Sequence, residues 1–386
     1  MTDPRVLVLH NRYRVEGGEE RAVDLHLQAL RSAGVEHRLF ERRSADTGRV
    51  RAAATLVRGG GDGEEIEAAV RDLRATVAHA HNMLPLIGPR GLGAARRAGA
   101  RVVLHLHNVR LFCATGFGER DGAPCTRCRG RRTLPGLVLN CRRSLPEAAA
   151  YASALSAHQP EVLEAVERFV TPSAWAADRV AMLGLPRKRV QHLPHFLPGD
   201  WFAARSGAGE GAYALVLSRL SPEKGIDDAI AAAAAAGVPL RVAGEGPEHE
   251  RLAELAGRSR VDVELLGRVS RARALELLDG AAMVLMPSHY HEFSPYTALE
   301  AMARGVPVVA SAMGGLPELL GPKRCVAPGD SGAFAARMAA LWADPRARAA
   351  EGGELIERTR ARHSEEAFVS GLRALYASLG DAAPVT

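Results

Sequence analysis

A chain of 386 residues, 47% hydrophobic and 24% charged, has the composition of a globular protein and exceeds the size of one compact core. We therefore expect two domains. The net charge of +6 leaves two explanations open: a bias towards arginine and alanine, or anionic partners such as phosphates, nucleic acid or an acidic membrane surface. No secretory signal opens the chain, and its longest weakly polar stretch, residues 229–240, is too short for a bilayer. We expect a cytoplasmic protein, in which five cysteines argue against a disulfide framework.

The first half of the chain alternates short apolar runs with stretches of helical periodicity, which is typical of a parallel α/β sheet. The pattern breaks at 111–150, a loop that carries four cysteines, and resumes with a helix over 160–167. We read the stretch 198–211, rich in glycine and small residues, as a linker. The strands predicted before the linker are 5–9, 35–42, 76–82, 101–108, 168–173 and 190–194, and the main helices are 21–34, 64–75, 90–100 and 174–184.

A second alternating series follows the linker and begins with the apolar run at 213–220. The fold class predicted is α/β, with two doubly wound Rossmann-like domains facing a cleft. In such sheets, ligands bind at the carboxyl ends of the strands. The predicted boundaries are 1–198 for the N-terminal domain, with the cysteine-rich loop at 111–143, 212–364 for the C-terminal domain, and 365–386 for a helix that crosses back to the first.

A junction between strand and helix in the second half, "LSRLSPEKG", carries the cations Arg219 and Lys224. Backbone N–H groups and the helix dipole at such a junction favour an anion. Arg219 can bind two phosphate oxygens at once, and Lys224 acts as a point charge. The pair predicts a diphosphate site, although two solvated surface charges remain the simpler alternative.

Two carboxylates bracket the segment "HEFSPYTALE". Ser294 suits an N-cap and Pro295 a first helical position, so we expect a helix that ends near Gly305. Glu300 then lies roughly 7–8 Å along the axis from the helix start, which suits a ribose whose diphosphate sits at that start. Glu292, on the other side of the phosphates, suits the hydroxyls of an attached sugar. The alternative is an ordinary loop acid and a helix surface acid.

With these motifs in order, the chain resembles the retaining family-4 glycosyltransferases of the GT-B fold. The resemblance rests on the two glutamates followed by "AMARGVPVVAS", on "LSRLSPEKG", "VAGEGPE", "LLGRVS" and "GGLPELL", and on "HNRYRVEGGEE", "AHAHN" and "VVLHLHN" in the first half. It implies an N-terminal domain that binds the acceptor and a C-terminal domain that binds a nucleotide-sugar donor, UDP-sugar as the commonest choice. The acceptor is not specified: a lipid-linked saccharide or a small molecule, in polysaccharide or glycoconjugate synthesis.

The resemblance also assigns roles to residues. Arg219 and Lys224 neutralise the diphosphate, Glu300 binds ribose and Glu292 binds the transferred sugar. His107 matches the histidine that contacts this sugar, whereas we regard His105 as structural and Glu19 as a helix-start acid. The residues implied to be catalytic are His107, Arg219, Lys224 and Glu292, and those implied to bind the donor are Gly17, Gly18, Gly244, Phe293, Ser294, Tyr296, Thr297 and Glu300.

The chemistry expected is a displacement on one face of the sugar, in which charge grows on the departing diphosphate and fixed cations stabilise it. No carboxylate pair of the glycosidase type is evident, and we expect no catalytic cofactor or divalent metal, because the cations take the place of a metal. Asp227 and Asp228 begin a helix and are interpreted as capping residues.

The loop at 111–143 has a pattern of four thiols, with one cysteine on each side of a C-x-x-C pair. This pattern predicts a structural, tetrahedral zinc site, and free reduced cysteines are the alternative. Six arginines between residues 127 and 143 crowd the same loop, either for solubility or to dock an anionic acceptor or lipid head groups, so peripheral contact with an anionic membrane stays open. The predicted zinc ligands are Cys113, Cys125, Cys128 and Cys141.

Two other functions are weighed against a sugar transferase. A zinc-stabilised nucleic-acid-binding protein would explain the charge but not Glu292 and Glu300, and no aromatic stacking motif is present, so nucleic acid is not an expected partner. A nucleotide-sugar epimerase on the same fold would act on the donor alone.

Overall fold

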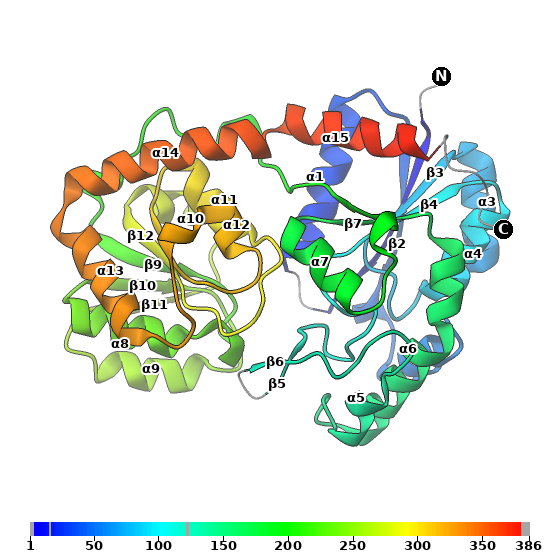
Figure 1. Cartoon of the computed structure of the whole chain (residues 1–386), viewed down its shortest axis with the longest axis horizontal. Helices are drawn as coiled ribbons and strands as arrows, with labels where there is room; N and C mark the ends of the chain where they lie inside the picture. The colour runs from blue at the N-terminus through cyan, green and yellow to red at the C-terminus, as the bar shows by residue number, and fades with distance from the viewer. Residues whose placement is uncertain (1–3, 15–16, 121–122, 380–386) are drawn as a thin grey trace. The chain divides into compact units, whose positions relative to one another are not determined.

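The computed structural model describes residues 4–14, 17–120 and 123–379, and these residues form two compact units. Of the described residues, the first unit comprises 4–14, 17–120, 124–194 and 368–379, and the second comprises 123 and 195–367. Each unit is built around a six-stranded parallel sheet with helices packed around it (Figure 1). Two doubly wound α/β domains are therefore confirmed as the fold class. Among the described helices, none combines the length and the apolar character that crossing a membrane requires.

The first sheet has the strand order β2-β1-β3-β4-β7-β8, and every neighbouring pair is parallel. Its central strands are buried on both faces, which explains why they are continuous apolar runs rather than alternating ones. The order reverses at β1, so the carboxyl ends of β1 and its neighbours form a topological switch point. The strands are β1 (Val6–Arg12), β2 (His37–Arg43), β3 (Val77–Ala80), β4 (Arg101–His105), β7 (Arg168–Thr171) and β8 (Val190–His192).

The helices of the first unit include the last helix of the chain, α15, whose residues from Phe368 onward belong to this unit. Residues 380–386, the end of the segment predicted to return, lie outside the described residues. The helical elements are α1 (Gly18–Ser32), η1 (Ser44–Asp46), α2 (Arg49–Val57), α3 (Gly63–Leu73), α4 (Gly88–Arg97), α5 (Leu134–Val138), α6 (Leu145–Ala165), α7 (Ala174–Met182), η2 (Arg187–Arg189) and α15 (Glu365–Ser378).

The helix predicted over 160–167 begins earlier than expected, because α6 starts at Leu145, shortly after the predicted cysteine-rich loop 111–143. The prediction was wrong because this helix is rich in alanine, which gives no clear apolar period, and because Pro160 lies inside it. The short helix α5 and the two-stranded sheet of β5 (Glu119–Arg120) and β6 (Ala123–Pro124) lie within that loop. Positions 121 and 122 of the predicted loop fall outside the described residues.

The second sheet has the order β11-β10-β9-β12-β13-β14 and is also parallel throughout. Strand β12 is buried at every position, and side chains from α8 and α13 complete the apolar core on one face. The strands are β9 (Tyr213–Leu217), β10 (Leu240–Ala243), β11 (Val263–Gly267), β12 (Ala281–Met286), β13 (Val308–Ser311) and β14 (Cys325–Val326).

The helices of the second unit alternate with its strands, and the long helix α14 closes the unit. Arg348 of α14 is buried and donates to the carbonyls of Ala208 at 2.9 Å and Leu341 at 2.8 Å, which ties the start of the unit to its end. The helical elements are η3 (Gly199–Trp201), η4 (Ala208–Glu210), η5 (Pro222–Lys224), α8 (Ile226–Ala236), α9 (His249–Gly257), α10 (Arg271–Asp279), α11 (Tyr296–Ala303), α12 (Leu316–Leu320), η6 (Pro322–Arg324), α13 (Ser331–Ala343) and α14 (Pro345–His363).

Candidate active site

The loops that follow β9, β10, β12 and β13 meet at the carboxyl edge of the second sheet, and glycines make this possible. At Gly244, with a φ of +149°, a Cβ would lie 1.8 Å from the carbonyl oxygen of Ser218. At Gly314, with a φ of +65°, a Cβ would lie 2.1 Å from the carbonyl oxygen of Glu292. No side chain fits at such distances, so these two positions require glycine. Gly244 therefore acts by letting the loops pack closely.

The centre of this edge is an ion pair between Lys224 and Glu292. Lys224 Nζ lies 2.7 Å from Glu292 Oε1, and their side chains are 18% and 6% exposed. The same carboxylate accepts from the hydroxyls of Tyr290 at 2.7 Å and Ser288 at 3.1 Å. Lys224 also donates to the Tyr290 hydroxyl at 3.1 Å. Two predicted catalytic residues, from different loops, are thus in direct contact.

The pKa values of this cluster follow from burial and from the charges packed together. Burial alone lowers the pKa of Lys224, but the adjacent Glu292 carboxylate outweighs burial and raises that pKa above its ordinary value. Burial and the same carboxylate both raise the pKa of Tyr290. Near neutral pH the site therefore presents a fixed ammonium cation and a neutral phenol, which is the form needed to hold a developing anion.

Arg219, the second predicted cation, lies in the same loop as Lys224 but has different partners. Its side chain is 47% exposed and forms an ion pair with Glu223, and its Nε donates to Ser221 Oγ at 3.2 Å. Burial raises the pKa of Glu223, but hydrogen bonds from the backbone and Ser221, together with the Arg219 charge, bring it below its ordinary value. Arg219 is therefore held in place by these partners, while part of its side chain remains open to solvent.

Helix α11 carries the remaining predicted donor residues. The helix starts at Tyr296 with Pro295 as its N-cap, so the prediction of Ser294 as N-cap was wrong by one position. Glu300 is 7% exposed on the inner face of the helix, whereas a surface acid would be solvated. Phe293, Ser294 and Tyr296 are also buried.

Contacts around the start of α11 fix its position at the sheet edge. Thr297 Oγ1 donates to the carbonyl of Leu217 at the end of β9, at 3.1 Å. His195 Nδ1 lies 3.1 Å from the carbonyl oxygen of Ser294, and its ring stacks on Tyr296 with centroids 4.6 Å apart. The sequence analysis missed His195, Ser288 and Tyr290. Only Tyr290 had a visible signal, since it is two residues before Glu292.

Asp228, interpreted as a capping residue, lies in the first turn of α8 and pairs with His289, whose Nε2 is 2.5 Å from Asp228 Oδ2. It therefore anchors the loop after β12 as well as sitting at a helix start. Asp227 of the same turn pairs with Arg251 at 3.2 Å.

The other predicted residues lie in the first unit, at the carboxyl ends of β1, β3 and β4. Strand β4 ends at His105, so His107 lies in the loop directly after it and is half-buried. Gly17 is the N-cap of α1 and Gly18 its first residue, and the Glu20 carboxylate accepts from the Gly17 N–H at 2.8 Å. A small cavity of about 30 Å³ opens beside His107, Tyr13, Glu19 and Arg110, with room for about one water molecule.

Glu19 is more than a helix-start acid. Its Oε2 accepts from the Tyr13 hydroxyl at 2.8 Å and from Asn108 Nδ2 at 3.3 Å, at the edge of this cavity. Burial raises the pKa of Glu19 to about 7, and Arg110 and the Tyr13 hydrogen bond only partly oppose this rise. A carboxyl that titrates near neutrality inside a cavity can exchange a proton with a bound hydroxyl.

The four predicted zinc ligands are half-buried free thiols of the first unit. Burial raises the pKa of Cys128 to about 11, and the other three thiols of the set add to the rise. All three are therefore near enough to interact with Cys128. In the part of the chain that the structure describes, the groups of three or more possible ligands within 4.8 Å are formed by histidines instead.

The second unit matches a known family. Residues 201–358 match the model for glycosyl transferases group 1. The chain is 38% identical over 156 residues to a glycogen synthase of Mycobacterium tuberculosis, covering 38% of this chain and 37% of the relative. It is 32% identical over 228 residues to a D-inositol 3-phosphate glycosyltransferase of Kribbella flavida, covering 52% and 54%. The chain thus spans between about a third and a half of the length of these curated relatives.

Solved structures match the whole chain. The sucrose-phosphate synthase of Thermosynechococcus elongatus aligns with a TM-score of 0.73 at 19% identity, covering 98% of this chain and 100% of that one. HepE of Anabaena, solved in complex with UDP-glucose, aligns with a TM-score of 0.67 at 15% identity, covering 97% and 100%. At these identities the likeness concerns the fold. The family match therefore concerns residues 201–358, and the likeness to the solved structures concerns the fold of the whole chain.

Proposed function

We propose that this chain is a retaining glycosyltransferase that moves a hexose from a nucleoside diphosphate to an acceptor hydroxyl. The observation that carries the proposal is the Lys224–Glu292 pair beside the start of α11, with Glu300 buried on the same helix. Lys224 supplies a fixed positive charge for the diphosphate, and Arg219 adds a second at the rim. UDP is the first choice of nucleotide, in keeping with the UDP-glucose complex of HepE.

The role of Glu292 follows from its partners. Three side chains, Lys224, Tyr290 and Ser288, donate to its two oxygens, so the carboxylate is held as an anion that accepts hydrogen bonds. A sugar hydroxyl can add to this set or replace Ser288. Such a carboxylate positions a sugar and is poorly suited to attack one, which favours transfer on a single face without a covalent intermediate on Glu292. His107 contacts the transferred sugar in this proposal, and Gly17 and Gly18 border the acceptor.

The test is a thermal-shift screen against nucleotide-sugars with UDP, ADP and GDP as the nucleotide, followed by titration of the best donor. We expect Glu300→Gln to weaken that donor at least tenfold, because a carboxylate bound to two hydroxyls is replaced by an amide. Glu254→Gln, on the exposed face of α9, is the matched control and leaves the affinity unchanged. Equal affinity in Glu300→Gln and the wild type would contradict the ribose assignment.

Product analysis then tests the mechanism. We expect the anomeric configuration of the donor to be retained in the product, as read by NMR of the new glycosidic bond, and activity to persist in EDTA. An inverted product would contradict transfer on one face. Sugar isomerised in the absence of any acceptor would instead indicate an epimerase, which the comparisons do not favour.

We further propose that Cys113, Cys125, Cys128 and Cys141 hold a structural zinc ion. Four thiols are a donor set that suits Zn²⁺, and burial together with the neighbouring thiols raises the pKa of Cys128, which a metal would lower. Elemental analysis of purified protein should find about one zinc per chain, and Cys128→Ser should lose it. Cys325→Ser is the control, because Cys325 belongs to the other unit. Protein without zinc would contradict the proposal.

The arginines of the same loop are only partly available for an anionic partner. Arg142 pairs with Glu147 at 2.8 Å and stacks over Tyr151, while Arg131 donates to the Ser156 carbonyl at 3.1 Å. Docking to an anionic membrane therefore remains a prediction, to be tested by flotation with vesicles that contain anionic lipid.

A further inference from the structure

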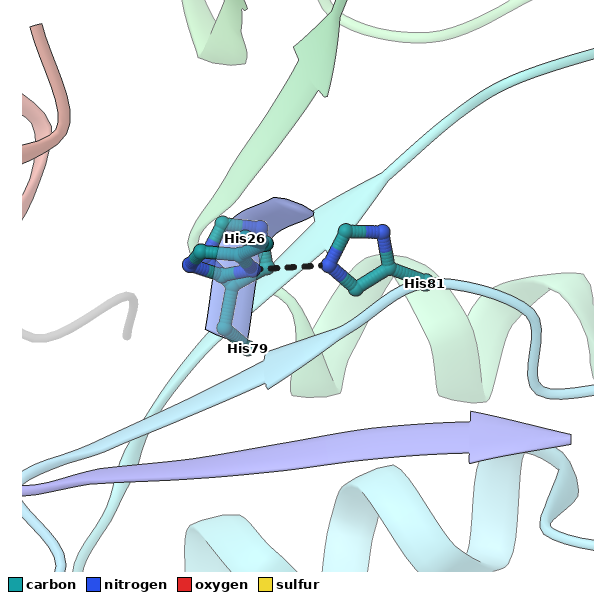
Figure 2. A group of neighbouring side chains, drawn as sticks. All are labelled: His26, His79 and His81. Atoms are coloured by element: carbon teal, nitrogen blue, oxygen red, sulfur yellow. Dashed lines mark hydrogen bonds between the residues drawn. The ribbon is translucent and has the colours of Figure 1, made fainter. Parts of the chain in front are cut away.

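Six histidines gather in the first unit, on β1, α1, β3 and the end of β4. His10, His26, His79, His81 and His105 are buried, and His107 continues the row towards the surface. His79 of β3 stacks with His81 just after this strand, and His105 of β4 stacks with His107 just after that one, with centroids 5.1 and 4.5 Å apart. Figure 2 shows His26 bonded to His81 beside His79. Polar side chains buried at this density require a defined network of hydrogen bonds.

A bound metal ion is the first hypothesis for such a group. The ring nitrogens of His26, His79 and His81 lie within 4.8 Å of one another, as do those of His81, His105 and His107. A metal must lie in the plane of each ring that binds it. The rings of His79 and His81 are stacked with an angle of 17° between their planes, and those of His81 and His107 with 11°. Rings in parallel planes can still share an ion when they lie edge to edge, but in each group two ring nitrogens already lie at hydrogen-bond distance, His26 Nδ1 from His81 Nε2 at 2.8 Å and His81 Nδ1 from His107 Nε2 at 2.9 Å, so we turn to the hydrogen bonds themselves.

Hydrogen bonds form one continuous chain from a buried hydroxyl to His107. The Tyr376 hydroxyl on α15 lies 3.2 Å from His26 Nε2, and His26 Nδ1 lies 2.8 Å from His81 Nε2. His81 Nδ1 in turn lies 2.9 Å from His107 Nε2. A branch joins the same hydroxyl to His79 Nδ1 at 2.9 Å. We call Tyr376, His26, His81 and His107 the histidine relay.

The positions of the protons in the relay are linked. Burial lowers the pKa of His26 to about 3 and the pKa of His79 and His81 well below the ordinary value, so these rings are neutral and each carries one N–H. If Tyr376 donates to His26, then His26, His81 and His107 must all carry their proton on Nδ1. If Tyr376 donates to His79 instead, all three must carry it on Nε2. These two arrangements satisfy the same hydrogen bonds with opposite polarity.

The branch at His79 distinguishes the two arrangements. His79 Nε2 is fully buried and has no hydrogen-bond partner among the described residues. In the first arrangement this atom is a bare acceptor, and in the second it is an N–H donor without an acceptor. Buried donors without partners are the rarer of the two in proteins. We infer that Tyr376, His26 and His81 are positioning residues that hold His107 in the tautomer protonated on Nδ1, with Nε2 accepting from His81.

A catalytic role for the histidine relay rests on the proposed function. A histidine in water exchanges freely between its two tautomers, whereas the relay holds His107 in one of them and fixes the orientation of the ring. His107 then offers an N–H to an oxygen of the sugar or acceptor at Nδ1, without first having to change tautomer. Its Nε2 is engaged by His81 and is not the atom that contacts the sugar.

The experiment is NMR of the full-length protein with ¹⁵N-labelled histidine, in which long-range proton–nitrogen correlations identify the tautomer of each ring. We expect His26, His79, His81 and His107 all to carry the proton on Nδ1, with the other tautomer at least about tenfold less populated. Assignment comes from the signals lost in single variants. Protonation of His107 on Nε2, or an even mixture of its tautomers, would overturn the inference.

Variants separate a positioning role from simple packing. His81→Phe removes the donor to His107 and should release His107 into a mixture of tautomers, whereas His81→Asn places an amide N–H near the former Nδ1 and should restore the Nδ1–H form. His79→Phe, two residues away on the same strand face, should leave the His107 signal unchanged, because the Tyr376 hydroxyl then keeps His26 Nε2 as its acceptor and the polarity of the relay is the same. If His81→Phe fails to fold, the wild-type spectrum and the His81→Asn spectrum still show which tautomer His107 adopts. An unchanged His107 signal in a folded His81→Phe overturns the inference.

Activity gives a second readout. Under the proposed function, His81→Phe should lower kcat for sugar transfer about tenfold, and His81→Asn should recover most of it. The NMR result needs no substrate. A protein with the expected tautomers but without transferase activity would therefore contradict the proposed function and leave the relay intact.

Discussion

At the scale of single residues, the Lys224–Glu292 contact is the interaction on which the second unit's site most depends. A carboxylate 6% exposed is tolerated only because a cation and two hydroxyls compensate for the water it has lost. Under the proposed function the same contact serves stability and chemistry, since it fixes the cation that would face the leaving group. Removing either partner should therefore affect both.

Lys224→Met should destabilise the protein by about 3 kcal/mol, the lower end of the range for a broken buried pair, because Lys224 keeps some exposure. Lys224→Met combined with Glu292→Gln should lose less than the sum of the two single changes. The measurement is urea unfolding followed by tryptophan fluorescence. Arg258→Met, which breaks an exposed pair with Glu254, is the control and should cost under about 0.5 kcal/mol. Additive single and double changes would show that the pair is not coupled.

At the scale of elements, the carboxyl edge of the second sheet brings together loops that pack against one another. The loops after β9 and β10 meet at Gly244, and those after β12 and β13 meet at Gly314, with Gly315 N–H donating to the Glu292 carbonyl at 2.7 Å. Glycine is required here because two stretches of backbone approach each other closely. At Gly314 this approach fixes the backbone position of Glu292.

Gly314→Ala should therefore reduce both stability and donor binding. The added methyl would lie 2.1 Å from the Glu292 carbonyl oxygen, so the loop must move. Gly329→Ala is a matched control, because Gly329 has a φ of +79° but no neighbour within 4 Å. We expect about 1 kcal/mol for the control, from backbone strain alone, and at least about 2 kcal/mol more for Gly314→Ala. Thermal unfolding with and without donor checks this, and equal losses would contradict it.

Most elements could be predicted from the sequence because burial on both faces turns parallel strands into apolar runs, as in β1 and β12. The boundaries failed where side chains carry little information. Alanines concealed the first turns of α6, and the Ser294–Pro295 pair fits two adjacent N-cap positions equally well. The spacing of Glu292 and Glu300 indicated one site because a single loop and helix join them.

Contacts between distant segments could not be predicted in this way. His79 and His81 are two residues apart on and just after β3 and so share a face, but the bonds of the Tyr376 hydroxyl to His79 and His26 join segments 297 and 350 residues apart. Burial raises the pKa of Glu19 while Arg110 and Tyr13 partly oppose the rise, and only the tertiary fold produces this environment. Nothing local in "GGEE" distinguishes that glutamate from a helix-start acid.

At the scale of the whole molecule, buried neutral histidines couple folding to pH. Burial, with a contribution from Arg12, lowers the pKa of His10 to about 4, and burial lowers the pKa of His26 to about 3, from 6.5 in the unfolded chain. Between these values and 6.5 the unfolded chain binds more protons than the folded one. These histidines therefore make stability rise with pH in this window, and the stability is lost as the pH falls below 6.5.

Each such histidine should contribute about 1.4 kcal/mol per pH unit to the slope of unfolding free energy between pH 6.5 and about 4. Urea midpoints at pH 7, 6 and 5 measure that slope. His26→Phe should reduce it by about one histidine's share, while His249→Gln, at an exposed position, should leave it unchanged. A slope that is the same in His26→Phe and the wild type would contradict the assignment.

The return of α15 to the first unit has a consequence for how the protein is made. All strands of this unit's sheet have been synthesised by residue 194, but the hydroxyl that completes its polar interior belongs to Tyr376, which is synthesised much later. At 5 to 20 residues per second, translation of the intervening 182 residues takes roughly 10 to 40 seconds. For that time His26 and His79 lack their hydroxyl partner, so the second unit can be complete before the first acquires its native interior.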